Sequence, residues 1–202
     1  MKNNLNEMTE ALFIIDMNNG FCENGALADP TIKHIVPAIS KLAREVLKNN
    51  QALFIVNDKH TGNSVELKRY PAHCHTAYET KTIKELRIYE EYATKVFYKN
   101  STCALFAPHM IDTLMAMTSL EKVVITGCCS DICIQNFAIA LRNFFDELNL
   151  DIEIVVPLNT METYDNKNSH DRIKSNILAI NNMRANGINM PLTLTLKKEG
   201  NK

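Results

Sequence analysis

The alternation of short apolar runs with segments of helical periodicity constrains this chain more than any other feature of its sequence. Six runs rich in β-branched and aromatic residues are predicted to be strands, at residues 11–17, 51–57, 94–98, 121–126, 151–156 and 192–196. Strands separated by helices usually pair in parallel, because each helix returns the chain to the same edge of the sheet. The pattern predicts an α/β fold, with a mostly parallel six-stranded sheet as the middle of three layers.

Apolar side chains recur at helical spacing in four segments between or after these strands. The first segment, residues 36–47, has Pro37 in its first turn, where a missing N–H donor removes no helix hydrogen bond. The others are residues 108–117, 131–148 and 171–185. Neither a linker nor a repeat interrupts the pattern, so we expect a single domain over residues 1–202 with a core of about residues 11–196.

The composition narrows the classes of function. The chain has 202 residues and balances 22 Lys and Arg against 23 Asp and Glu, so it has no overall field to attract nucleic acid or an anionic membrane. It also lacks the roughly 20 consecutive apolar residues of a membrane span and the apolar stretch of a signal peptide. We therefore expect a cytoplasmic protein with free cysteine thiols that acts on a small molecule.

Three reactive side chains follow predicted strands at their carboxyl ends, where sheets of this kind bind ligands. Cys133 lies at a strand-to-helix turn, where backbone N–H groups and the helix dipole would lower a thiol pKa and stabilise an oxyanion. Asp16 ends a buried strand and needs a partner, and Lys99 could stabilise both a carboxylate and a thiolate. The simpler alternatives are a buried apolar cysteine, a turn aspartate and a solvated lysine such as Lys95.

A dense set of carboxylates and imidazoles follows the second predicted strand. The segment NDKHTGNSVELKRYPAHCH contains Asp58, His60, Glu66 and His73, which suit zinc or another divalent first-row ion. The competing interpretations are ligation by Cys74 or His75, or a polar loop with exposed histidines. A zinc site on the cysteines of residues 128–133 is disfavoured, because adjacent cysteines seldom reach one tetrahedral ion.

Taken together, these motifs resemble the isochorismatase-like cysteine hydrolases, and within them the nicotinamidases and pyrazinamidases, over about residues 11–190. The resemblance is carried by IIDMNNGFCENGAL, NDKH with YPAHC, KNSTCALF and TGCCSDICI. It implies that Asp16, Lys99 and Cys133 form the catalytic triad and that Phe21 is a wall for an aromatic substrate.

The resemblance also implies a cofactor and a reaction. Asp58, His60, Glu66 and His73 would bind a divalent metal, zinc first, with Mn²⁺ and Fe²⁺ as alternatives. A cis peptide would join Cys128 and Cys129, and the amides of Cys129 and Cys133 would bind the oxyanion. The implied reaction is hydrolysis of nicotinamide to nicotinate and ammonia through a cysteine thioester, in a protein that forms homo-oligomers.

Three departures from the family pattern line the expected pocket. Asn18 and Gly20 replace a glutamine and an aspartate, HCHTAYET replaces the usual glycine-threonine, and the segment after Lys99 is shorter. A pocket selects its substrate by its shape and by a few polar groups, so these changes affect which substrate is accepted. Two alternatives stay open: a related cysteine hydrolase of another small amide, and a catalytically silent protein that binds a metal or small molecule.

Overall fold

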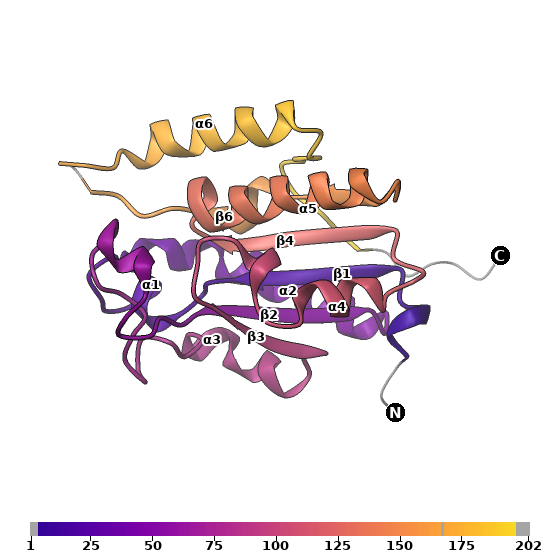
Figure 1. Cartoon of the computed structure of the whole chain (residues 1–202), viewed down its shortest axis with the longest axis horizontal. Coiled ribbons are helices and arrows are strands. Elements are labelled where there is room, and N and C mark those ends of the chain that lie inside the picture. The colour runs from indigo at the N-terminus through magenta and orange to yellow at the C-terminus, as the bar shows by residue number, and fades with distance from the viewer. Residues whose placement is uncertain (1–3, 167, 197–202) are drawn as a thin grey trace.

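The sheet has six parallel strands and lies between layers of helices, as the sequence predicts (Figure 1). The computed structural model describes residues 4–166 and 168–196. The order of the strands is β3-β2-β1-β4-β5, with β6 also paired to β4. Their bounds are β1 Glu10–Ile15, β2 Ala52–Asp58, β3 Lys95–Lys99, β4 Lys122–Cys128, β5 Glu153–Val155 and β6 Met161–Glu162.

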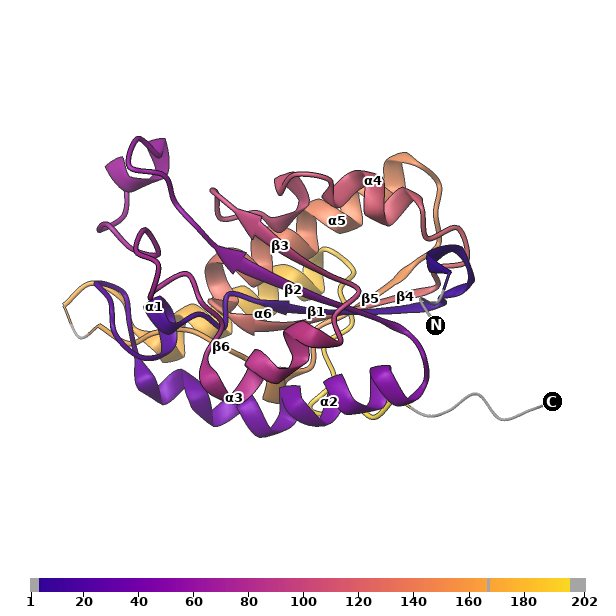
Figure 2. The ribbon, with the colours of Figure 1, turned by 90° about the horizontal axis from the view of Figure 1, so that it is seen from below.

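The helices cover both faces of the sheet. Helices α2 and α3 lie on one face, whereas α4 and α5 lie on the other with α6 packed on α5 (Figures 1 and 2). Their bounds are α1 Asn19–Cys22, α2 Val36–Lys48, α3 Lys84–Arg87, α4 Met110–Met115, α5 Gln135–Glu147 and α6 Arg172–Ala185. Short 3₁₀ helices occupy Leu5–Glu7, Pro30–Ile35, Val65–Lys68, Ile88–Glu91, Ala104–Phe106 and Leu158–Thr160. Over the described residues, none of the helices is long and apolar enough to cross a bilayer.

The predicted strand at residues 192–196 is wrong. The structure describes this segment without a strand, and the sixth strand is instead the two-residue β6, which the sequence did not reveal. Polar side chains at the end of α2 bind the backbone of Leu196 in place of a neighbouring strand: Glu45 accepts from the Leu196 amide at 2.8 Å, and Asn49, the residue after α2, donates to the Leu196 carbonyl at 3.5 Å. The Leu192 carbonyl accepts from the Asn159 amide at 3.2 Å, so these backbone groups are satisfied without a sheet.

Two predicted helices differ at their starts. The segment predicted at 131–148 begins with a π-helical turn, Ser130–Ile134, before α5 continues it. The segment predicted at 108–117 begins two residues later, at Met110, because His109 has a left-handed backbone with φ of 66°. The π-helical turn contains Cys133, one of the side chains predicted to react.

Both faces of β1 are buried, which explains its uninterrupted apolar run. Phe13 and Ile15 belong to the core beneath α4 and α5, whereas Leu12 and Ile14 belong to the core beneath α2. Phe13 also packs on Phe54 of β2, with ring centroids 4.8 Å apart. This packing fixes the carboxyl ends of the central strands beside one another.

Gly127 allows β4 to pass close to β1 just before the strand ends. Its φ is +117°, and a Cβ atom at this position would lie 1.9 Å from the carbonyl oxygen of Ile15. We expect Gly127→Ala to lower the free energy of unfolding by about 3 kcal/mol or more, through the clash and the strained backbone. Urea denaturation measures the loss.

Gly62→Ala is the matched control, because a Cβ atom there has no neighbour within 4 Å. Its free energy of unfolding should stay within about 1 kcal/mol of the wild-type value. Equal stability of the two variants would contradict the role assigned to Gly127.

Candidate active site

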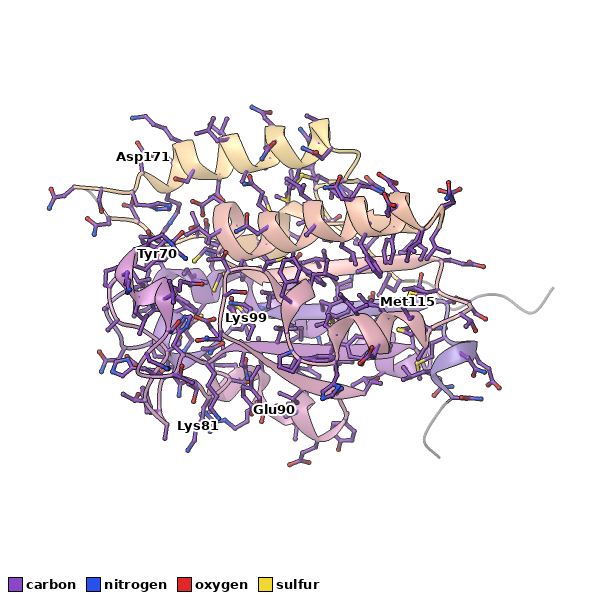
Figure 3. The ribbon with its side chains drawn as sticks, viewed as in Figure 1. Tyr70, Lys81, Glu90, Lys99, Met115 and Asp171 are labelled. Atoms are coloured by element: carbon purple, nitrogen blue, oxygen red, sulfur yellow. The ribbon has the colours of Figure 1, made fainter. Side chains whose placement is uncertain are left out.

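The side chains predicted to react come together at the carboxyl edge of the sheet. Asp16 follows β1, Asp58 ends β2, Lys99 ends β3 and Cys133 lies in the turn after β4. These four strands are neighbours in the order β3-β2-β1-β4, so residues far apart in sequence become adjacent. Figure 3 shows Lys99 at this edge, on the same end of the molecule as Tyr70.

Lys99 is the centre of this group. Its Nζ lies 2.8 Å from Asp16 Oδ2, 2.8 Å from Asp58 Oδ1 and 3.6 Å from Cys133 Sγ. The side chain is 1% exposed, so it is not a solvated strand-end lysine. Burial alone would lower the pKa of Lys99, but Asp16 and Asp58 raise it well above its usual value. A charged lysine is therefore buried between two carboxylates.

The environment of Asp16 suits a proton acceptor. Burial raises the pKa of Asp16 to about 6, although the Lys99 ammonium and the Cys133 thiol oppose the shift. With such a pKa, Asp16 is mostly ionised at neutral pH, and its protonated form is only slightly less stable than the carboxylate. Asp16 can therefore take up a proton and return it.

Cys133 differs from the sequence-based expectation in its pKa. A lowered pKa was expected from the helix start, but burial raises it well above its usual value; Lys99 opposes the shift, and Asp16 and Asp58 add to it. The resting side chain is a thiol beside a carboxylate. Its ionisation depends on transfer of the proton to a base rather than on a low intrinsic pKa.

The turn that carries Cys133 is held by several hydrogen bonds. The peptide bond between Cys128 and Cys129 is cis, as the family resemblance implies. The amides of Ile132 and Ile134 donate to the Cys129 carbonyl at 3.2 and 3.1 Å, and the Cys128 thiol donates to the Asp16 carbonyl at 3.1 Å. The two strand ends that bear Asp16 and Cys133 are thus joined directly.

Asp58, His60, Glu66 and His73 form one buried group whose ligand atoms lie within 4.8 Å of one another. His60 Nε2 is 2.7 Å from Asp58 Oδ2, 3.2 Å from His73 Nε2 and 3.6 Å from Glu66 Oε1. In the part of the chain that the structure describes, this is the group able to hold a metal ion. Of the residues weighed as alternative ligands, Cys74 is buried outside the group and His75 pairs with Glu79 on the surface.

The outer hydrogen bonds turn both imidazoles toward the same point. His73 Nδ1 donates to the Pro71 carbonyl at 2.7 Å, which leaves Nε2 with its lone pair. His60 Nδ1 faces Asn100 Oδ1 at 3.0 Å and Ser64 Oγ at 3.2 Å. Two nitrogens bound to one tetrahedral zinc stand roughly 3.3 Å apart, close to the observed 3.2 Å. Facing lone pairs beside two carboxylates fit a divalent cation.

Asp58 belongs to both groups. Its Oδ1 accepts from Lys99, and its Oδ2 faces the two histidines. Burial would raise the pKa of Asp58, but Lys99, His60 and His73 together lower it well below its usual value. The backbone carbonyl of Asp58 accepts from Asn18 Nδ2 at 3.0 Å, so the residue that departs from the family pattern supports this strand end.

A narrow pocket with a free volume of only about 20 Å³ joins the two groups. Phe21 is one wall, with its ring centroid 5.4 Å from that of His73. The sequence did not identify Leu27, Tyr70, Thr102, Ile132 and Tyr164 as lining residues. Tyr70 stands in the quoted YPAHC motif, whereas Tyr164 lies in a stretch without a motif. The pocket places apolar walls around a thiol and a metal-binding group.

Comparison with known proteins agrees with this architecture. A family model described as the Isochorismatase domain matches residues 10–187. A search by sequence among curated proteins finds no match.

Three solved structures illustrate the likeness of fold. The pyrazinamidase/nicotinamidase of Streptococcus mutans UA159 has a TM-score of 0.73 and 21% identity over 90% of this chain and 99% of its own. The N-carbamoylsarcosine amidase of Thermoplasma acidophilum has a TM-score of 0.70 and 22% identity over 91% and 96%. The pyrazinamidase of Pyrococcus horikoshii, in complex with zinc, has a TM-score of 0.69 and 17% identity over 90% and 97%.

The metal-binding group can be tested without an activity assay. His73→Ala removes an inward-facing ligand and should weaken zinc binding at least about 100-fold, while Asn100→Ala should weaken it roughly 10-fold to 100-fold by releasing His60. Competition with a chromophoric chelator measures both affinities. His75→Ala, which changes a surface histidine, should bind zinc like the wild type; an equal loss in this variant would contradict the assigned ligand set.

The pairing of Asp16 with Cys133 predicts a pH dependence of thiol reactivity. Alkylation requires a proton to leave this pair, so the rate at Cys133 should rise with pH through about 6, the pKa of Asp16, and then level off. Iodoacetamide kinetics, with peptide mapping of the modified residue, measures this profile. Asp16→Asn removes the titrating carboxylate and should remove the inflection near pH 6; an unchanged profile would refute the pairing.

Proposed function

The chain belongs to the isochorismatase family of hydrolases, and we propose that it hydrolyses the carboxamide of a small aromatic amide, nicotinamide, with Cys133 as nucleophile. The observation that carries this proposal is the contact of one buried ammonium, Lys99, with Asp16, Asp58 and Cys133. It supplies a nucleophile, a base and a fixed positive charge in one water-poor site.

The first half of the reaction forms a thioester. Asp16 takes the proton of the Cys133 thiol, and the thiolate attacks the carbonyl carbon of the amide. Lys99 stabilises the negative charge that remains in the site, and the amides of Cys129 and Cys133 bind the oxyanion. When the carbon–nitrogen bond breaks, Asp16 returns the proton to the leaving nitrogen and ammonia departs.

The second half restores the enzyme. Asp16 takes a proton from a water molecule, whose oxygen attacks the thioester carbonyl. The carbon–sulfur bond breaks, the acid product leaves, and Cys133 regains its proton from Asp16. One water is consumed and the thiol is regenerated.

A divalent ion held by Asp58, His60, Glu66 and His73 would bind the ring nitrogen of the substrate and so orient its carboxamide. Two imidazoles with carboxylates favour zinc, and Mn²⁺ and Fe²⁺ are the alternatives. The zinc complex of the Pyrococcus horikoshii pyrazinamidase supports the same choice. The ion would thus supply orientation of the substrate, whereas Asp16, Lys99 and Cys133 would carry out the proton transfers and the attack.

The walls of the pocket favour a neutral aromatic amide over a carboxylated aliphatic one. Phe21, Tyr70 and Tyr164 offer aromatic faces, and no arginine or lysine is among the described residues that line the space. Lys99, beneath it, is already paired with two carboxylates. A substrate such as N-carbamoylsarcosine would find no basic side chain for its carboxylate among these walls, and its charge would have to be balanced by the metal ion alone.

The assay that tests this function is ammonia release from nicotinamide by the zinc-loaded protein. Cys133→Ala should lower the rate at least about a thousandfold, because no other group in the site replaces the nucleophile. Cys103→Ala is the matched control, since this half-buried thiol contacts Asn136 outside the pocket, and its activity should stay near the wild-type value.

The same assay separates the alternatives. Turnover of N-carbamoylsarcosine instead of nicotinamide would show that the substrate specificity is that of another branch of the family. Absence of turnover across a panel of small amides, in protein with full metal content, would favour a silent binding protein. Wild-type activity in Cys133→Ala would refute the mechanism itself.

A further inference from the structure

Tyr164 forms one wall of the pocket and is supported from behind by a histidine. Its ring lies 4.0 Å from that of His170, with an angle of 15° between the two planes. We propose that Tyr164 is the residue that selects flat aromatic substrates, and that His170 and Asp131 position it. The identity of the substrate class rests on the proposed function, whereas the positioning rests on the contacts that follow.

Two hydrogen bonds fix the plane of the His170 ring. Nδ1 donates to the Tyr164 carbonyl at 2.9 Å, and Nε2 lies 2.7 Å from Asp131 Oδ2. The stacked contact and these two polar contacts lie on the same ring, which orients it against Tyr164. His170 therefore holds the backbone and the aromatic ring of Tyr164 at once.

Asp131 connects this support to the nucleophile. It lies in the π-helical turn Ser130–Ile134, two residues before Cys133. The loop after β6, which carries Tyr164, is thus tied to the turn that carries the attacking sulfur. Asp131, His170 and Tyr164 form a chain of contacts that sets the wall relative to Cys133.

The residues before and after Tyr164 in the loop are also held by hydrogen bonds. The Asp165 amide donates to Asp29 Oδ2 at 2.9 Å, and Arg172 Nε donates to the Thr163 carbonyl at 3.0 Å. Residues on both sides of Tyr164 are therefore held. A fixed aromatic wall favours a rigid planar ligand, because little ordering of the protein is needed on binding.

The proposal can be tested at Cys133 without turnover, by comparing two alkylating agents on the zinc-loaded full chain. Iodoacetanilide carries an aromatic ring, whereas iodoacetamide does not, so the ratio of their rate constants at Cys133 measures aromatic selection. The wild-type ratio should exceed that of a free cysteine in solution. Tyr164→Ala should lower it roughly tenfold by removing the ring contact, and Tyr164→Phe should preserve it.

His170→Ala tests the positioning role. It should lower the ratio severalfold while the iodoacetamide rate stays within about twofold of wild type, because the wall loses its support whereas the turn of Cys133 keeps the hydrogen bonds of Ile132 and Ile134 to the Cys129 carbonyl. Tyr92→Ala, which removes an exposed tyrosine, is the control for loss of a tyrosine ring. If Tyr164→Ala does not fold, Tyr164→Leu keeps an apolar wall and removes only its aromatic character.

The outcomes are decisive for each part. An unchanged ratio in Tyr164→Ala or Tyr164→Leu, or a wild-type ratio no higher than that of free cysteine, overturns the selection role. A wild-type ratio in His170→Ala overturns the positioning role. Ammonia release from nicotinamide is measured separately, so a wild type that selects aromatic rings but releases no ammonia refutes the proposed function and supports the inference.

Discussion

The burial of Lys99 between two carboxylates is the interaction on which the rest of the site depends. Removing an ammonium ion from water costs several kcal/mol unless opposite charges replace the solvent. Asp16 and Asp58, each 2.8 Å away, supply that replacement from two neighbouring strands. The same two carboxylates raise the pKa of Lys99, so the lysine is a cation beside Cys133. The contacts that make its burial possible therefore also place a positive charge next to the thiol.

One carboxylate links the Lys99–Cys133 contact to the metal-binding group. Asp58 faces Lys99 with one oxygen and His60 and His73 with the other, so a charge bound on one side changes the field on the other. The Lys99 ammonium keeps Asp58 ionised, which a metal ligand requires. The pocket lies over this junction, and both Cys133 and His73 line it.

The fold and most of the candidate site followed from local patterns. Apolar runs located five of the six strands, and the motifs around Asp16, Asp58, Lys99 and Cys133 marked the edge where they meet. The strand prediction at 192–196 was wrong because strand periodicity does not show which partner is available, and side chains at the end of α2 bind the backbone of Leu196 instead. The lowered pKa predicted for Cys133 was wrong for a related reason. Burial and the nearby carboxylates of Asp16 and Asp58 raise this pKa by more than the strand-to-helix turn lowers it.

The sequence by itself determined the order of strands and helices, the residue types at each strand end, and the resemblance to a family of hydrolases. Only the tertiary structure decided which of these residues touch. Tyr164 and His170 lie outside any motif, and Asp131 stands in the TGCCSDICI motif without a role assigned from sequence. Their contacts join a loop after β6 to the turn after β4. Spacing along a chain encodes local geometry, whereas stacking and charge pairing between distant segments depend on how the whole sheet is packed.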